Sequence, residues 1–479
     1  MRSPGSGVAG EFDAVVVGAG PNGLAAAIAI AQAGRTVALV EAADRVGGGC
    51  RSAELTLPGF VHDVCSAVHP FAIASPFFRS LPLAQHGLEW IQSPAMLAHP
   101  LDEGTGAVVY RSVRETARGL GRDEGAYCDL FEPLIEAWPK IEEAVLGPLR
   151  WPRHPVALAR FGLRALRPAE PLARRLFTGE PARALFGGMA AHGMLPLDMR
   201  PTAGVGLALN LLAHVAGWPI PRGGAQRLAD ALAAYLRSLG GRIMTGTTVT
   251  SIDDLPKARA ILCDLSPAPF LRIAGHRLPP RFRRALERYR YGMAAFKVDW
   301  ALDGPIPWRN PEWARATTVH LGGTLGDIAS AEREAWDGGH PERPFVLLAQ
   351  PTLFDETRAP AGRHVAWTYC HVPRGSGADM LPRLERQIER FAPGFRDRVL
   401  ARAVMGPADL ERRNANYVGG DIGSGASDLP QLFMRPTWRT YSTPVRGLYM
   451  CSAATPPGVG VHGMCGYFAA RRALAEVLR

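Results

Sequence analysis

The first forty residues carry the feature that most limits how this chain can fold. A short apolar run at residues 13–17 is followed by the motif Gly-Ala-Gly-Pro-Asn-Gly at 18–23, a helical pattern to residue 33, and a second apolar run at 36–40. Residues 14–33 are apolar enough to resemble a membrane helix, but three glycines and a proline argue against one. The strand–turn–helix–strand order is the setting in which G-x-G-x-x-G binds a dinucleotide.

Each part of the motif has a physical role. Gly18 permits the tight turn, Gly20 lets the backbone approach a pyrophosphate, and Gly23 lets the helix pack closely on the strand. The helix pattern runs from Leu24 to Ala33, so free N–H groups and the positive end of the helix dipole face the phosphates, and we expect Pro21 and Asn22 of the preceding turn to contact the cofactor. Glu41 follows the second strand, where a carboxylate accepts hydrogen bonds from a ribose.

A second glycine-rich loop, residues 44–52, follows Glu41 directly. Such a loop is typical of FAD enzymes, so we expect Gly48, Gly49 and Arg51 to contact the phosphates or the flavin. The alternative is an ordinary surface loop with a solvated arginine.

From residue 13 onward the chain resembles the FAD-dependent phytoene desaturase and amine oxidase superfamily, and most closely the bacterial phytoene dehydrogenase-like oxidoreductases. The resemblance rests on three blocks, at residues 13–70, 221–249 and 447–464. The chain departs from the family in an extra glycine before Arg51, and in reading Ser-Ala-Ala-Thr at 452–455 where Gly-Ala-Gly-Thr is usual.

The resemblance implies an α/β fold. A discontinuous Rossmann-like FAD-binding domain of the glutathione-reductase and amine-oxidase type is expected from residues 1–75, 218–275 and 440–479. A mixed α+β substrate domain is expected from 76–217, mostly helical, and from 276–439. The strand candidates in the substrate domain are residues 295–301, 317–320, 345–350 and 364–371.

The resemblance also implies further cofactor contacts. The segment 458–464 is expected to begin the last helix and to place its N–H groups against the flavin. FAD is expected to bind non-covalently, because no cysteine stands where covalent attachment is usual. The implied contacts are Val249, Ser452, Ala453, Gly460, Val461, His462 and Met464.

Three residues are candidates for catalysis. Lys297 lies in a segment similar to the amine-oxidase strand that carries a lysine near flavin N5; the alternative is a lysine that extends along its strand to solvent. His69 and His462 flank the expected flavin face, where each can act as a general base or as a structural hydrogen-bonding group. His320 and His371 are weaker candidates. No cluster has metal-ligand spacing, so no metal site is predicted.

The leading functional hypothesis is hydride abstraction from a carbon of a largely apolar or natural-product substrate, with oxygen or a quinone as electron acceptor. The alternatives are an oxidase of an amine-bearing substrate, and a reduced-FAD isomerase or saturase without net redox change. The C-terminal block lacks the aromatic ring that amine oxidases place at the flavin, which favours the first hypothesis. The substrate and the oligomeric state stay undetermined at this stage.

Charge and cysteine content limit the partners. The net charge is +10, but 51 arginines against 3 lysines indicate a compositional bias rather than nucleic-acid binding. Seven scattered cysteines without a C-x-x-C pair, and an N-terminal tail without an apolar run, favour a cytoplasmic protein. Residues 149–177 carry seven arginines among apolar residues, with prolines that break the segment. They form either a peripheral membrane contact or a solvated face.

Overall fold

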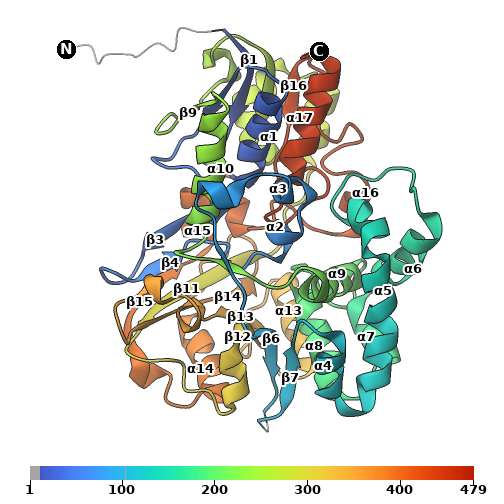
Figure 1. Ribbon diagram of the computed structural model, residues 1–479, viewed down its shortest axis with the longest axis vertical. Helices are drawn as coiled ribbons and strands as arrows, with labels where there is room; N and C mark the ends of the chain where they lie inside the picture. Colours follow the sequence, from blue (N-terminus) through green and yellow to red (C-terminus); the bar gives the residue numbers. More distant parts are fainter. Residues whose placement is uncertain (1–10, 103) are drawn as a thin grey trace.

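The computed structural model describes residues 11–102 and 104–479. The chain is elongated, with one sheet near each end and helices between and around them (Figure 1). The N-terminal tail discussed above lies, up to residue 10, outside the described residues. All seven cysteines are free.

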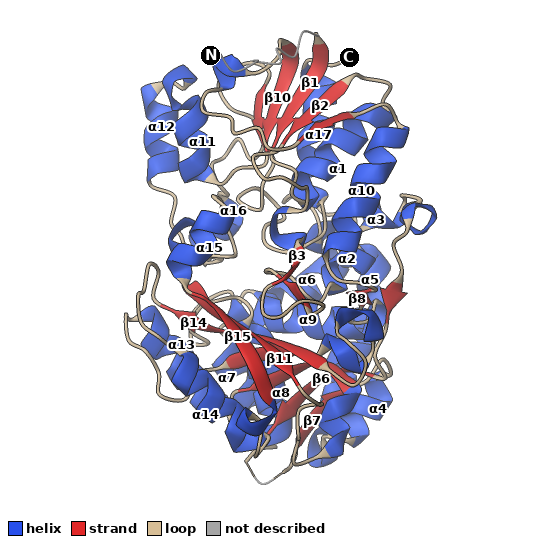
Figure 2. Ribbon diagram, turned by 90° about the vertical axis from the view of Figure 1, so that its left-hand side faces the viewer, coloured by secondary structure: helices blue, strands red, loops and turns tan. Residues whose placement is uncertain are grey.

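One end of the molecule is built on a five-stranded parallel sheet in the order β16-β10-β1-β2-β9. Parallel strands of this kind are buried on both faces and therefore have continuous apolar sequences. Figure 2 shows α11 and α12 on one side of this sheet and α1, α10 and α17 on the other. The strands are β1 (Phe12–Val17), β2 (Val37–Val40), β9 (Arg242–Met244), β10 (Ala258–Cys263) and β16 (Leu448–Met450).

The covering helices come from four distant parts of the sequence. They are α1 (Pro21–Gln32), α10 (Gln226–Ser238), α11 (Pro267–Ala274), α12 (Pro280–Glu287) and α17 (Met464–Glu476). Helices α1 and α17 touch at Gly466, where a Cβ atom would lie 1.7 Å from the Asn22 carbonyl oxygen. The sheet and its helices confirm the predicted Rossmann-like α/β class, assembled from discontinuous segments.

The other end is built on a seven-stranded mixed sheet in the order β15-β11-β14-β13-β12-β6-β7. All neighbours are antiparallel except β12 and β6. The four predicted strand segments correspond to β11 (Ala294–Leu302), β12 (Ala316–Leu321), β13 (Val346–Ala349) and β14 (His364–Val372). Three strands were not predicted: β6 (Ala95–Pro100), β7 (Gly106–Val109) and β15 (Val399–Met405).

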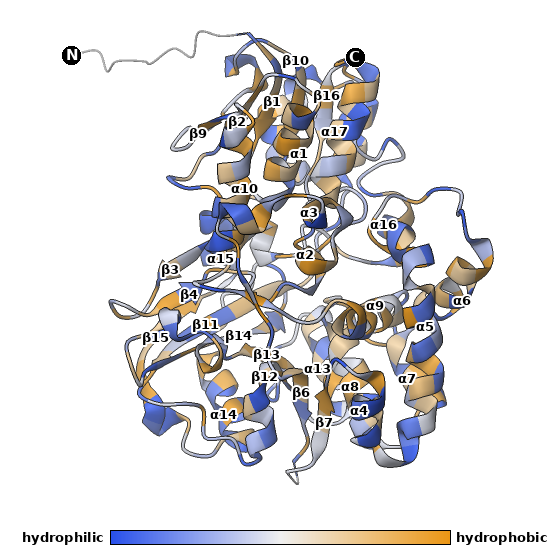
Figure 3. Ribbon diagram, in the orientation of Figure 1, coloured by the Kyte–Doolittle hydropathy of each residue, from blue (hydrophilic) through white to orange (hydrophobic). Residues whose placement is uncertain are grey.

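Helices connect and cover the two sheets. Prolines divide the arginine-rich segment, so that α6 begins at Pro155 and α7 follows Pro168. Helix α9 is apolar on nearly all sides, as its colouring in Figure 3 shows, and it is buried among α5, α6, α7 and α8. These helices are α2 (Pro70–Ala74), α3 (Pro76–Arg79), α4 (Val113–Arg118), α5 (Glu124–Val145), α6 (Pro155–Ala165), α7 (Ala169–Leu176), α8 (Glu180–Ala191), α9 (Thr202–Val215), α13 (Leu325–Trp336), α14 (Leu381–Phe391), α15 (Pro407–Arg413) and α16 (Leu429–Phe433).

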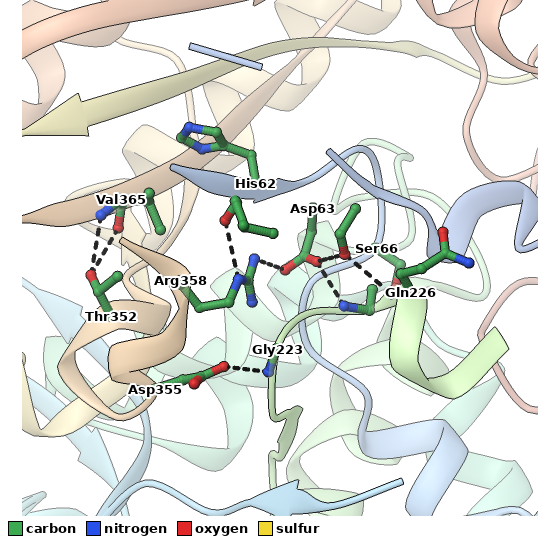
Figure 4. Close-up of polar contacts among 12 residues, drawn as sticks. His62, Asp63, Ser66, Gly223, Gln226, Thr352, Asp355, Arg358 and Val365 are labelled. Carbon is green, nitrogen blue, oxygen red and sulfur yellow. Dashed lines mark hydrogen bonds and ion pairs between the residues drawn. The ribbon is translucent and has the colours of Figure 1, made fainter. Parts of the chain in front are cut away.

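Two short hairpins complete the fold, β3 (Ser52–Glu54) with β4 (Val61–Asp63), and β5 (Trp90–Ile91) with β8 (Ile220–Pro221). Next to the first, Arg358 is 1% exposed; it pairs with Asp63 at 2.9 Å and donates to the Val61 carbonyl (Figure 4). Asp63 also accepts from Ser52 and from the amide of Ala225. This buried network joins the hairpin to the loop before α10.

Candidate functional site

The turn after β1 has the geometry expected of a phosphate-binding loop. Gly18 has φ +95°, and a Cβ on Gly23 would lie 1.9 Å from the Gly18 carbonyl oxygen. Gly20 caps α1, and Pro21 is its first residue. Gly18, Gly20, Pro21 and Asn22 line a cavity of about 1100 Å³, whereas Gly23 lies behind it and allows the close packing of turn and helix.

Glu41 stands at the end of β2, beside this turn. Its carboxylate accepts from the amides of Ala19 at 2.7 Å and Ala43 at 2.9 Å, and it lines the cavity. Val249 lines the same end of the cavity. The carboxylate is therefore oriented by backbone donors next to the predicted dinucleotide loop.

The second glycine loop lies directly against the first. A Cβ on Gly48 would be 2.9 Å from Gly20 Cα, and one on Gly49 would be 2.5 Å from the Tyr417 hydroxyl. Arg51 donates to the carbonyls of Gly48 at 3.0 Å and Arg413 at 2.6 Å. Gly48, Gly49 and Arg51 all line the cavity, so this segment is part of the site rather than a remote surface loop.

The C-terminal block forms another wall of the cavity. Ala453, Gly460, Val461 and His462 line it. Ser452 does not: it is buried and donates to the Leu265 carbonyl at 2.9 Å. The last helix begins at Met464, whose amide donates to His462 Nδ1 at 3.0 Å; Met464 also stands behind the lining.

The two histidine candidates line the cavity and are each 1% exposed. Burial lowers the pKa of each to about 4. His462 Nδ1 accepts the Met464 amide, so the neutral ring carries its proton on Nε2. His69 Nε2 contacts Ser66 Oγ at 3.0 Å, and its Nδ1 has no partner among the described residues.

Lys297 lies behind the cavity wall rather than in it. In β11 its Nζ pairs with Asp299, and it lies 5.7 Å from the ring of Trp367, which does line the cavity. Burial lowers the pKa of Lys297 and raises that of Asp299 to about 6. His62 Nδ1 approaches Asp299 at 3.6 Å. The lysine is thus part of a buried pair one layer from the cavity.

Five charged residues of the cavity lining were not predicted from the sequence, and two of them, Asp264 and Arg435, are buried. Asp264 follows β10, lines the cavity and accepts the Gly23 amide at 3.0 Å. Burial, with a contribution from Glu41, raises its pKa to about 7. Glu41 and Asp264 both follow parallel strands, whose carboxyl ends meet at one edge of the sheet, so this signal was present in the sequence.

Arg435 is the second. It is 5% exposed, lines the cavity beside Gly458, and donates to the carbonyls of Ala453, Gly423 and Ser424. No carboxylate pairs with it in residues 11–102 and 104–479. It is a fixed buried cation, since an arginine does not lose its proton.

Beyond the C-terminal block the cavity continues into an apolar chamber. Its walls come from α9, from the segment that follows α8 and from the strands β12, β13 and β14, and its outer rim comes from α6 and α16. The chamber side chains include Leu209, Trp218, Thr318, Leu347, Trp367 and Tyr369, and those at the rim include Leu158, Leu166, Leu432 and Phe433.

The weaker histidine candidates lie behind this chamber. His371 Nδ1 contacts Glu332 at 2.7 Å, and His320 Nε2 contacts His192 Nε2 at 2.9 Å. His192 itself lines the chamber and was not predicted from the sequence.

The first part of the cavity fits a dinucleotide. A ribose-binding carboxylate, a helix N-terminus and glycines that leave room for phosphates lie along one wall. Arg435, the fixed cation, lies on the neighbouring wall, close to the start of α17.

Comparison with known proteins agrees with this arrangement. A family model described as an NAD(P)-binding Rossmann-like domain matches residues 16–80. A phytoene dehydrogenase of Streptomyces griseus is 26% identical, over 85% of this chain and 80% of its own. A structure of a putrescine oxidase variant has a TM-score of 0.62 at 16% identity, covering 98% of this chain and 99% of the other. The chain is an oxidoreductase that is similar in sequence to phytoene desaturases and in fold to a putrescine oxidase.

The alignment with another relative covers nearly the whole chain. It is the pyridine nucleotide-disulfide oxidoreductase domain-containing protein 2 of Rattus norvegicus, 27% identical over 96% of this chain and 93% of its own. In the described part of the chain, no helix is long and apolar enough to cross a membrane.

Proposed function

We propose that the chain binds FAD non-covalently and oxidises a largely apolar substrate by hydride abstraction from carbon. The observation that carries this proposal is the single cavity that joins the dinucleotide loops to an apolar chamber. Bound FAD supplies the hydride acceptor. Its adenine and ribose would lie at Val249 and Glu41, its pyrophosphate at residues 18–23, and its flavin between residues 458–464 and the chamber.

The protein contributes electrostatics and the exclusion of water. Arg435 and the N-terminus of α17 place positive charge beside the wall where negative charge develops on reduction. Cys50, which is buried, and Cys65, which is half-buried, also line the cavity, and desolvation raises the pKa of both thiols. A protonated thiol is a poor nucleophile, which supports non-covalent binding.

The charge of the cavity favours a neutral substrate over an ammonium ion. Its carboxylates, Glu41 and Asp264, stand at the dinucleotide loops, and its arginines are Arg51, Arg272, Arg412, Arg413 and Arg435. One feature favours an amine oxidase as a second candidate: the rings of Trp367 and Tyr369 lie 5.2 Å apart on the chamber wall, and such surfaces attract cations.

The test is anaerobic mixing of the purified holoprotein with phytoene, putrescine or cyclohexylamine while the flavin absorbance is followed. Bleaching of the flavin absorbance by phytoene supports oxidation at carbon. Bleaching by putrescine or cyclohexylamine supports an amine oxidase instead. A compound converted only after photoreduction of the flavin indicates an isomerase or saturase. Protein that retains no flavin after added FAD would contradict the proposal.

The same experiment, continued by admitting air, addresses the electron acceptor. Fast reoxidation identifies oxygen as an acceptor, whereas slow reoxidation that a soluble quinone accelerates identifies a quinone.

We also propose that the rim of the chamber rests on a membrane surface, from which an apolar substrate reaches the chamber. Trp151, just before α6, is 95% exposed. Val156 and Leu163 in α6 and Phe433 in α16, the two helices that form the rim, are exposed as well. Arg160, Arg164 and Arg167 in and next to α6 add positive charge. Cosedimentation with vesicles containing anionic lipid tests this; no binding with or without that lipid removes the proposal.

A further inference from the structure

Three histidines form a row that leads away from the apolar chamber. His192 follows the last residue of α8 and lines the chamber, His320 lies in β12, and His99 lies in β6. His320 and His99 are fully buried. The three residues are distant in sequence, so the row exists only in the folded protein.

The contacts along the row are specific. His192 Nε2 and His320 Nε2 are 2.9 Å apart, and His99 Nε2 lies 2.8 Å from the Gly323 carbonyl oxygen. The Nδ1 atoms of His320 and His99 have no partner among the described residues. Both face Gly188 in α8: a Cβ there would lie 2.8 Å from His320 Nδ1 and 2.9 Å from His99 Nδ1. One water beside Gly188 would therefore have two polar partners and would bridge the rings.

The carbonyl at the far end fixes the tautomer of His99. A carbonyl only accepts, so His99 Nε2 carries a proton and its Nδ1 accepts. A bridging water donates to His99 Nδ1, and it can either accept from His320 Nδ1–H or donate to an unprotonated His320 Nδ1. In the first arrangement His320 Nε2 accepts from His192 Nε2–H, and His192 Nδ1 keeps its lone pair. The relay needs this first arrangement, and the spectra described below distinguish it from the second.

This assignment requires three neutral rings. Burial lowers the pKa of His192 to about 3 and that of His99 to about 4, and it lowers the pKa of His320 well below its ordinary value. All three are therefore neutral at physiological pH in the free protein.

We propose that His192 is the proton-accepting residue of the oxidation and that His320 and His99 are positioning residues that hold its tautomer and carry the proton onward. This rests on the proposed function. When a substrate loses a hydride from one atom, the neighbouring C–H bond loses its proton to His192 Nδ1, and the electrons of that bond form the new double bond. The proton on His192 Nε2 then passes to His320 Nε2, and that on His320 Nδ1 passes to His99 Nδ1, which leaves the positive charge on His99.

The first test measures the tautomers directly and needs no substrate. Two-bond ¹H–¹⁵N correlation spectra of the full-length holoprotein, labelled at histidine, distinguish Nδ1–H from Nε2–H rings. His192→Gln, His320→Gln and His99→Gln assign the signals. We expect Nε2–H on His192 and His99, and Nδ1–H on His320. A proton on Nδ1 of His192 would overturn the proposal.

A pair of glycine variants tests the coupling without altering a histidine. Gly188→Ala places its methyl group between the two Nδ1 atoms, whereas Gly187→Ala, one residue earlier in α8, meets a flexible Leu325 methyl group at 2.6 Å. We expect Gly188→Ala to mix the tautomers of His192, although the new methyl group contacts His320 and His99 and not His192 itself. Gly187→Ala should leave the His192 tautomer unchanged. Identical His192 signals in both variants and the wild type would show that the rings are not coupled.

A kinetic test uses the compound that reduces the wild-type flavin in the panel above. General base catalysis contributes at least about 100-fold, so His192→Gln should slow anaerobic reduction by at least that factor. His214→Gln, in a separate buried contact with Tyr127, is the matched control and should change the rate little. An unchanged rate in His192→Gln refutes the relay while the function stands. If no compound reduces the wild-type flavin, the proposed function loses its support, and the spectra still decide the relay.

Discussion

Asp264 offers a quantitative test of the electrostatics at the dinucleotide loop. Its carboxyl is buried, and only one hydrogen-bond donor, the Gly23 amide, contacts it among the described residues. Asp264→Asn keeps the shape and an oxygen that accepts the same amide, but it removes the ionisation. The difference between the two proteins therefore isolates the cost of placing a negative charge here.

The sign and size follow from the pKa, which rises from 3.8 to about 7 on folding. Well below pH 3.8 the group is neutral in both states, and ionisation adds no cost to folding. As the pH rises from 4 to 7 the unfolded chain ionises first, so the folded state loses stability relative to the unfolded one. At about 1.4 kcal/mol per pKa unit, the full cost above pH 7 is about 4 kcal/mol.

The assay is urea unfolding of the cofactor-free proteins between pH 4 and pH 8. The stability of Asp264→Asn relative to the wild type should increase with pH by about 4 kcal/mol across this range. Asp13→Asn is the control. Hydrogen bonds from Thr36 lower the pKa of Asp13, so the stability of Asp13→Asn relative to the wild type should decrease, not increase, as the carboxyl ionises. A pH-independent difference between Asp264→Asn and the wild type would refute the reasoning.

FAD affinity reports the same ionisation independently. A bound pyrophosphate disfavours a second negative charge beside it, so binding above pH 7 should require uptake of a proton. The dissociation constant of the wild type should then rise by up to about tenfold per pH unit, while that of Asp264→Asn stays nearly flat. If the dissociation constants of the wild type and of Asp264→Asn depend on pH with equal slopes, the phosphates of FAD do not lie beside Asp264.

Three further predictions address packing, the loop and the rim. Arg358→Leu leaves Asp63 buried without its partner and should lower the free energy of unfolding by about 3–5 kcal/mol, as measured by urea unfolding. Arg222→Ala is the control and should change that free energy little, because its pair with Glu89 is exposed. Gly20→Ala places a Cβ atom 2.7 Å from Asp264 Oδ2 and should weaken FAD binding at least about tenfold, as read by flavin fluorescence, whereas Gly125→Ala, with nothing within 4 Å, should not. Trp151→Ala with Leu163→Ala should lower the vesicle partition coefficient roughly 100-fold at about 1.5 kcal/mol per side chain. Leu400→Ala with Val404→Ala removes two partly exposed apolar side chains from β15, away from the rim, and should leave the coefficient unchanged.

The N-terminal site was predictable because its constraints are local. Gly23 packs on the Gly18 carbonyl within one turn, which the motif spacing specifies, whereas the contacts of Gly18 and Gly20 with Asp264 depend on a residue far along the chain. The central strands of the second sheet were predictable from continuous apolar runs. Strand β6 was missed because its sequence, Ala-Met-Leu-Ala-His-Pro, is short and ends in proline; its pairing with β12 is set by residues more than 200 positions away.

Lys297 shows where sequence reasoning stopped. Asp299 stands two residues later, and residues i and i+2 of a strand share a face, so the ion pair was predictable from β periodicity. Lys297 lies opposite Tyr369, on the sheet face from which Trp367 and Tyr369 line the cavity. What the sequence could not tell is that the lysine itself is buried against Asp299 and Trp367 and does not reach the cavity lining, because that depends on the packing of the β14 side chains.

The distribution of ionisable groups also connects the two halves of the proposed reaction. Carboxylates stand at the dinucleotide loops, Arg435 stands near the start of α17, and histidines stand at the chamber. A hydride that moves toward the cationic wall and a proton that moves toward neutral histidines separate in opposite directions. In a low-dielectric cavity this separation is stabilised only when each charge has its own fixed partner. If Arg435 and His192 are those partners, replacing both should slow reduction by less than the product of the two single effects, because each variant already disrupts the same charge separation.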